Sequence, residues 1–97
     1  MAAYLIAHLN VTNPDAFEAY RTAVPAVIAA HGGRYLIRGG AAEALEGDWI
    51  VPRLIVLEFP DKAAAEGFYN SPEYQEILPL RLANAEGSVA IVDGFTG

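Results

Sequence analysis

The chain has 97 residues and a mass of 10.4 kDa, the size of one domain, so we expect residues 1–97 to fold as a single unit. Hydrophobic residues make up 54% of the chain and charged residues 19%, which excludes a disordered protein, and the absence of cysteine excludes disulfides and thiolate metal sites. The net charge of −6 disfavours nucleic acid, and no apolar stretch approaches the ~20 residues of a membrane span, so we expect a cytoplasmic protein that binds neither nucleic acid nor a membrane.

The first part of the chain predicts a strand, a long helix and a second strand. Residues 2–11 alternate with the period of two that is typical of a β-strand. Residues 13–14 (Asn-Pro) form a helix start, and glycines at 32–33 end the helix. Pro25 predicts a kink inside it, and residues 34–38 predict the second strand. The apolar stripe of this helix consists of Phe17, Tyr20, Val24, Val27, Ile28 and His31.

The remainder predicts two more strands and two shorter helices. Glycines at 39–40 indicate a bulge or a sharp bend, and a hairpin region then leads to a third strand at residues 53–59. A short helix is predicted at 62–69, and a Ser-Pro pair at 71–72 starts another helix. The last strand is expected at 88–92. The stripe of the last helix consists of Tyr74, Ile77, Leu78 and Leu82.

The order β-α-β-β-α-β predicts a ferredoxin-like α+β fold, with a four-stranded antiparallel sheet and helices on one face. Such a sheet normally has one apolar face and one polar face. Here both strand parities are apolar, but the helices lie on one side and can cover only one face of the sheet. We therefore expect a homodimer formed through the sheet face. The two sets are Tyr4, Ile6, Leu54, Val56, Ala90 and Val92 on one parity, and Leu5, Leu9, Ile55, Leu57, Phe59 and Ile91 on the other.

Five local strings occur in an order and spacing that is specific in combination. They are Ala30-His31-Gly32-Gly33-Arg34-Tyr35-Leu36, Arg38-Gly39-Gly40, Leu45-Glu46-Gly47-Asp48-Trp49, Leu57-Glu58-Phe59-Pro60 and Tyr69-Asn70-Ser71-Pro72-Glu73-Tyr74. Over nearly its whole length the chain resembles the bacterial family called domain of unknown function 1330. The resemblance implies membership of the dimeric α/β-barrel superfamily, and hence a face-to-face dimer. That superfamily includes cofactor-free monooxygenases, muconolactone-type isomerases, dehydratase-like proteins and haem enzymes, so the resemblance implies no single reaction.

Three polar residues on the predicted strands are candidates for catalysis: His8, Glu58 and Arg38. If their parity faces the barrel, His8 and Glu58 share a chamber, which Arg38 joins if the register allows. In one interpretation Arg38 binds a carboxylate or enolate, and Glu58 or His8 moves a proton. In the other, Arg38 and Glu58 form a cross-strand ion pair that fixes the register, and His8 is a bystander. The sequence leaves both interpretations open.

Five further residues are candidates for ligand binding at this chamber or its rim: Tyr4, His31, Trp49, Tyr69 and Asn70. Structural roles are the alternative for several of them. His31 suits the C-terminal end of a helix, Asn70 suits the restart of one, and Trp49 suits packing at a dimer interface.

The remaining signals concern metals and the other cations. Two histidines without an acidic residue at ligand spacing predict no metal site, and His8 on a strand is a poor haem ligand, so we expect no cofactor. Arg53 and Arg81 are expected to form surface or interface ion pairs. The functional expectation is a cofactor-free enzyme that acts by acid–base chemistry on a small carboxylated or enolisable metabolite. The alternative is a dimer that binds a small molecule without catalysis or is purely structural.

Overall fold

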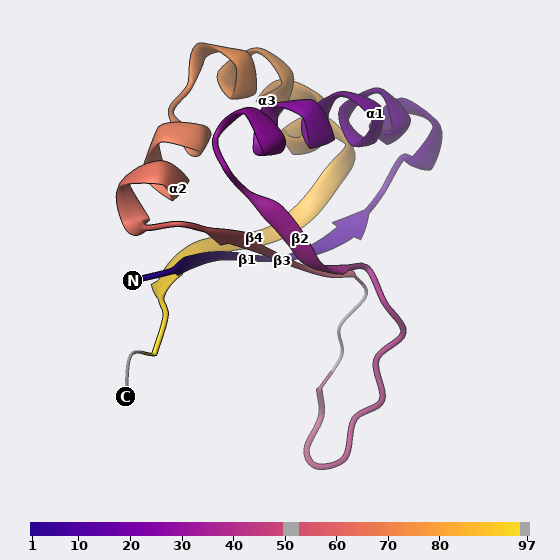
Figure 1. Ribbon diagram of the computed structural model, residues 1–97. Helices are drawn as coiled ribbons and strands as arrows, with labels where there is room; N and C mark the ends of the chain where they lie inside the picture. The colour runs from indigo at the N-terminus through magenta and orange to yellow at the C-terminus, as the bar shows by residue number, and fades with distance from the viewer. Residues whose placement is uncertain (50–52, 96–97) are drawn as a thin grey trace.

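Within residues 1–49 and 53–95, which the computed structural model describes, four strands form one antiparallel sheet and three helices pack on one of its faces (Figure 1). The strands lie in the order β2-β3-β1-β4. This is the predicted ferredoxin-like arrangement, and the fold class is confirmed. The elements are β1 (Ala3–Val11), α1 (Pro14–Ala30), β2 (Arg34–Arg38), β3 (Leu54–Phe59), α2 (Lys62–Tyr69), α3 (Pro72–Asn84) and β4 (Ala85–Asp93).

Side-chain caps start all three of these helices, as the sequence signals predicted for α1 and α3. The Asn13 side chain accepts a hydrogen bond from the Ala16 N–H at 3.3 Å, and Ser71 accepts one from the Tyr74 N–H at 3.1 Å. Asp61 caps α2 in the same way. These bonds satisfy backbone donors that have no partner inside the helix. In the described residues, no helix is long and apolar enough to cross a membrane.

Strand β4 begins at Ala85, three residues before the predicted start. Its partner β1 has nine residues, and the two strands pair along the whole of that length, from Ala3 opposite Asp93 to Val11 opposite Ala85. Pairing with a long central strand therefore extends β4 into a stretch whose own sequence carries no strand signal.

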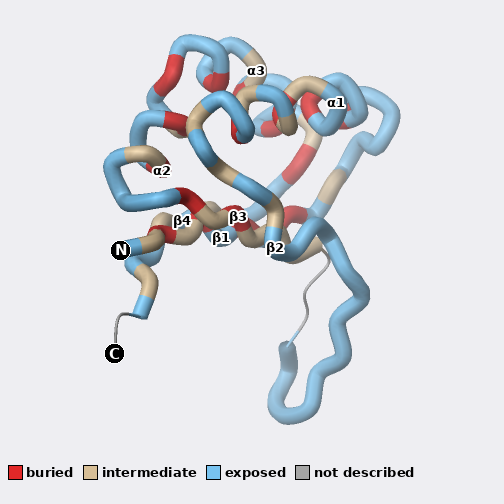
Figure 2. Tube along the Cα trace, in the orientation of Figure 1, coloured by how far each residue is buried: buried red, intermediate tan, exposed pale blue. Residues whose placement is uncertain are grey.

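The hydrophobic core lies between the helices and the inner face of the sheet, where the buried residues of Figure 2 gather. One predicted core position is wrong: Leu82 is 62% exposed, whereas Arg81 is only 7% exposed. A step of 100° per residue places position 81 within about 20° of Tyr74 on the helix surface, while position 82 is turned away. His31 is also not a core residue, because it forms the C-cap of α1 and is half-buried.

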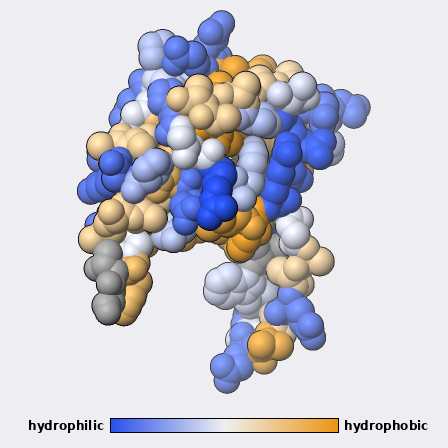
Figure 3. Space-filling model, in the orientation of Figure 1, coloured by the Kyte–Doolittle hydropathy of each residue, from blue (hydrophilic) through white to orange (hydrophobic). Residues whose placement is uncertain are grey.

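The other face of the sheet carries no helix, and apolar side chains are exposed on it (Figure 1). Ile6 in the central strand β1 is 36% exposed, and Val92 in β4 is 45% exposed. The loop at 39–49 extends from the edge of the sheet past this open face, and Figure 3 shows it as a projection from the body of the molecule. The loop carries exposed Leu45 and Trp49.

A bulge in β2 decides which face its later residues occupy. Arg34 pairs with Glu58 and Tyr35 with Leu57, but the next pair is Ile37 with Val56, so one residue is inserted at position 36. The bend predicted at 39–40 is also present, because the chain bends at Gly39, where φ is +69°, directly after β2. Because strand residues alternate between faces, a one-residue insertion moves every later side chain of β2 to the opposite face.

Candidate functional site

The predicted catalytic residues do not come together. Glu58 lies on the open face, where it accepts a hydrogen bond from the Tyr4 hydroxyl at 3.3 Å and forms an ion pair with Arg34 at 2.7 Å between Oε1 and Nε. His8 lies on the same face of β1, opposite Leu54 and exposed to solvent. On the open face, Glu58 thus contacts the predicted residue Tyr4 and forms its ion pair with Arg34, which was not among the residues predicted from the sequence.

The predicted pair between Arg38 and Glu58 is wrong. The bulge places Arg38 opposite Ile55, on the parity that faces the helices, so Arg38 and Glu58 lie on opposite faces of the sheet. Arg38 instead stacks on the Tyr35 ring, with its guanidinium carbon 4.7 Å from the ring centroid. Cation–π stacking of this kind contributes about 0.5–1 kcal/mol at exposed sites.

The other predicted ligand-binding residues are dispersed over the fold. His31 caps α1 and meets the Phe68 ring edge-on, with centroids 6.2 Å apart. Asn70 forms the C-cap of α2, and Trp49 is exposed on the projecting loop. Tyr69 packs its ring against the Tyr74 ring, with centroids 5.4 Å apart. Within the described subunit these four residues take structural or exposed positions and share no pocket.

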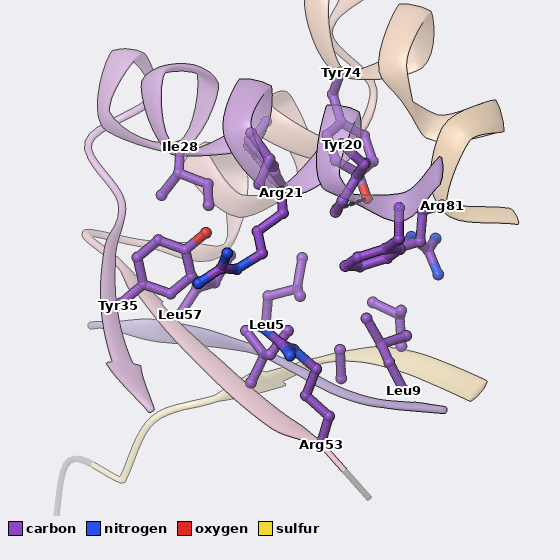
Figure 4. Close-up of a pocket in the computed structure, with 16 residues that line it drawn as sticks. Leu5, Leu9, Tyr20, Arg21, Ile28, Tyr35, Arg53, Leu57, Tyr74 and Arg81 are labelled. Carbon is purple, nitrogen blue, oxygen red and sulfur yellow. Dashed lines mark hydrogen bonds between the residues drawn. The ribbon is translucent and has the colours of Figure 1, made fainter. Parts of the chain in front are cut away.

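A chamber between the helices and the inner face of the sheet is the strongest candidate site (Figure 4). Its volume is about 50 Å³, which is room for about three to five water molecules. Apolar side chains from β1, β3, β4 and α1 form most of the wall. The lining residues are Leu5, Ala7, Leu9, Phe17, Tyr20, Arg21, Val24, Ile28, Tyr35, Arg53, Ile55, Leu57, Phe68, Tyr74, Arg81 and Val89.

The polar groups of the chamber are all cationic or neutral. Figure 4 shows Arg53 entering from the sheet, Arg21 from α1 and Arg81 from α3. The other polar groups are three tyrosine hydroxyls, and no lining residue in the described part of the chain carries a carboxylate. Arg53 directly precedes β3, and its carbonyl accepts a hydrogen bond from the Leu9 N–H at 2.8 Å, which fixes its backbone against β1.

Two of these arginines have a buried Nε atom without a partner among the described residues. The Nε atoms of Arg53 and Arg81 have no hydrogen-bond acceptor among the described residues. The described ion pairs involve other arginines: Arg21 with Glu18 at 3.3 Å, and Arg34 with Glu58. More than 90% of buried polar groups in proteins find a partner, and a buried charge without one is costly. Such exceptions cluster at binding sites.

The distribution of charge points to the same place. The chain has only six lysine and arginine residues against twelve acidic residues. Three of the six cations line the chamber, and Arg38 adds a fourth at its rim, since it stacks on the lining residue Tyr35. An acidic protein therefore places half of its cations on the wall of one apolar chamber, which favours an anionic ligand.

The tyrosines act there as hydrogen-bond donors. The hydroxyls of Tyr20 and Tyr74 lie 2.9 Å apart in a buried position. Burial, together with the neighbouring Tyr74, raises the pKa of Tyr20 well above its usual value, although the Arg81 guanidinium acts in the opposite direction. Burial also raises the pKa of Tyr35. Both phenols are therefore neutral at physiological pH, and neither is a base.

The expectation of surface ion pairs is wrong, because no described acidic side chain pairs with Arg53 or Arg81, and two sequence signals indicated that both lie toward the core. An ion pair of Arg53 across the dimer interface stays a prediction. Position 81 lies seven residues after Tyr74, on the buried stripe of the last helix. Arg53 continues the parity of Ile55 and Leu57, which face the core. Both cations thus occupied positions whose periodicity already indicated burial.

The sheet order and the helical layer define a ferredoxin-like α+β protein. A family model described as "Domain of unknown function (DUF1330)" matches residues 2–95, and the chain belongs to that family. This bears out the resemblance seen in the sequence. No curated protein matches the chain.

Several solved structures share the fold. RPA0582, a protein of unknown function from Rhodopseudomonas palustris, is 17% identical with a TM-score of 0.79 over 99% of this chain and 84% of that one. A dimeric ferredoxin-like protein of unknown function from Jannaschia sp. CCS1 is 16% identical with a TM-score of 0.71 over 97% and 100%. SnoaB, a cofactor-independent oxygenase from Streptomyces nogalater, is 13% identical with a TM-score of 0.66 over 99% and 95%.

Proposed function

We propose that the protein is a homodimer in which each subunit binds a small carboxylated or enolisable compound, as its anion, in the chamber between helices and sheet. One observation carries the proposal: the buried Nε atoms of Arg53 and Arg81 face an apolar chamber and have no acceptor among the described residues. A ligand oxygen with negative charge would supply the missing acceptor.

The chamber suits such a ligand in shape and chemistry. A guanidinium group binds a carboxylate through two parallel N–H donors, and these charge-assisted bonds are about twice as strong as neutral ones. The aliphatic and aromatic walls would contact the carbon skeleton of the ligand, and the hydroxyl pair of Tyr20 and Tyr74 would donate a hydrogen bond to one of its oxygens. The volume of about 50 Å³ favours a skeleton of a few heavy atoms.

The open sheet face supports the dimer. Apolar side chains on strands β1 and β4 are exposed there, and burying them against a second copy would remove that surface from water. A structural neighbour is described as a dimeric ferredoxin-like protein. In this proposal the bonded group of Tyr4, Glu58 and Arg34 positions the two subunits, and His8 lies at the same interface.

A second candidate function is catalysis on an enolisable acid without a cofactor. Arg53 and Arg81 are suited to stabilise an enolate oxyanion, and one structural neighbour is described as a cofactor-independent oxygenase. No base lines the chamber in the described residues, because Glu58 and His8 lie on the other face of the sheet. The chamber residues would therefore stabilise the ionised substrate, and the proton would leave to water.

Calorimetric titration with short carboxylic acids and with their amides tests the binding function. We expect acids to bind the wild-type protein and amides not to bind, because the amide has no charge for Arg81. Arg81→Gln should abolish acid binding, and Lys62→Gln, which removes an exposed cation on α2, should leave it unchanged. Acid binding that survives Arg81→Gln would contradict the proposal.

Hydrogen exchange tests the catalytic alternative. If the protein enolises its ligand, the α-hydrogens of a short 2-oxo acid exchange with deuterated water faster in the presence of wild-type protein. The same exchange rate with the Arg81→Gln variant would show that the chamber does not take part in the enolisation.

A further inference from the structure

The unpaired cations of the chamber belong to two separate groups. Arg53 enters from the sheet, and Tyr35, also from the sheet, lines the same wall (Figure 4). Arg81 enters from α3, and the hydroxyl pair of Tyr20 and Tyr74 bridges the helices beside it. Each group contains one arginine whose Nε is buried without an acceptor among the described residues, and at least one tyrosine hydroxyl. The sheet group and the helix group therefore offer the same chemistry from opposite sides of one chamber.

We propose that the ligand carries two acidic oxygen groups, one held by the sheet group and one by the helix group: a short dicarboxylate, or a carboxylate with an enolised oxo group. This inference rests on the proposed function and narrows its ligand class. A ligand with a single carboxylate at Arg81 would leave the Nε of Arg53 without an acceptor. A single carboxylate at Arg53 would likewise leave the Nε of Arg81 without one. Both donors are unmet before binding, so a ligand with two acidic groups gains a charge-assisted hydrogen bond that a ligand with one cannot gain.

The charges also balance only for a doubly charged ligand. Arg21 is paired with Glu18, so Arg53 and Arg81 are the two lining cations without an ion pair in the described part of the chain. A dianion would neutralise both and leave no net charge in an apolar space. A monoanion would leave one positive charge uncompensated in surroundings of low dielectric constant, where it interacts most strongly.

The tyrosine pair reinforces the choice of oxygen acceptors at the helix end. Within the pair one hydroxyl donates to the other, so the accepting hydroxyl keeps its own hydrogen for a further acceptor. That hydrogen and the Arg81 guanidinium are both donors. A ligand group that is itself a donor, such as an amide NH₂ or an ammonium, finds no acceptor there except the hydroxyl lone pairs.

A matched series of ligands tests the inference by calorimetric titration at constant ionic strength. The probes are the shortest diacids, oxalate, malonate and succinate, because the chamber is small, each with its own monoamide, which keeps the carbon skeleton and removes one negative charge. We expect at least one diacid to bind at least tenfold more tightly than its monoamide. Arg53→Gln should reduce the affinity of that diacid to the level of the monoamide, and Arg81→Gln should abolish its binding.

Lys62→Gln is the matched control, because it changes the net charge of the protein equally at an exposed position on α2. It should leave the diacid preference intact, which separates direct contact from a general effect of charge. Circular dichroism checks that each variant is folded, and where a glutamine variant is not, Arg53→Lys or Arg81→Lys replaces it. The lysine variants keep the charge but lose Nε, and we expect them to lose most of the preference.

The outcomes separate this inference from the proposed function. If diacid and monoamide bind equally and both need Arg81, the chamber binds a monoanion and the inference is wrong, while the proposed function stands. If neither diacids nor monoamides bind the wild-type protein, both the inference and the proposed function are wrong. If a diacid preference survives Arg53→Gln, the sheet group does not bind the second acidic group, and the inference is again wrong.

Discussion

Replacing Arg81 by methionine should stabilise the protein when no ligand is bound. Arg81 is 7% exposed as a residue, and its buried Nε has no acceptor among the described residues. A buried donor without a partner costs about 1–3 kcal/mol, and a charged one costs more. Methionine is unbranched and adaptable, so it fills the same space without a polar group. We therefore expect the free energy of unfolding to rise by about 1–3 kcal/mol.

Urea and thermal unfolding measure this change, at one protein concentration because the proposed dimer makes stability concentration-dependent. For a domain of this size each 1 kcal/mol shifts the melting temperature by roughly 4–8 °C. Arg21→Met is the matched control: its side chain is 48% exposed and paired with Glu18, and such pairs contribute at most about 1 kcal/mol. A loss of 1 kcal/mol or more in Arg81→Met would show that Arg81 holds the fold together, and would refute the argument that its charge is kept for a ligand.

Three further predictions concern the open face and the tyrosines. Ile6→Asp places a charge on the open face and should give a monomer by light scattering, whereas Leu82→Asp, on the helical side, should remain a dimer. The same oligomeric state in both variants would contradict the proposed interface. Glu58→Gln should leave acid binding in the chamber unchanged by calorimetry, because Glu58 pairs with the 70% exposed Arg34 on the opposite face of the sheet. Loss of acid binding would show that Glu58 belongs to the binding site. Because the pKa of Tyr20 is raised in the folded state, the native protein holds a proton that the unfolded chain releases above about pH 10, so the free energy of unfolding should fall as the pH rises past 10. Urea unfolding between pH 9 and 11 measures this decrease in the free energy of unfolding, which should be smaller in Tyr20→Phe. The same pH dependence in Tyr20→Phe and the wild-type protein would contradict the prediction.

The fold could be predicted because its signals are local. The caps at Asn13 and Ser71 define helix starts, and the alternation of residues 2–11 defines the central strand. The start of β4 could not be read in this way, because residues 85–87 become strand by pairing with β1. Their own sequence carries no such signal.

The candidate site was harder to predict because it depends on register. The residue inserted at Leu36 puts Arg34 and Arg38 on opposite faces of the sheet, so that only Arg34 shares a face with Glu58. No local pattern fixes the position of a bulge to one residue, since nearby glycines are equally suitable. Arg81 is different, because helical periodicity alone indicated that it is buried; the expectation that charged residues lie at the surface outweighed that signal.

Nuclear magnetic resonance of the arginine Nε–H groups tests the central claim most directly. The chain has five arginines, and each Nε–H group gives its own signal that responds to a new acceptor. During titration with the tightest-binding short acid, we expect the Arg81 and Arg53 signals to shift along saturable curves, while the Arg34 signal, on the open face, stays in place. A shift confined to Arg34, or no shift at Arg81 while the acid binds, would contradict the assignment of the chamber as the binding site.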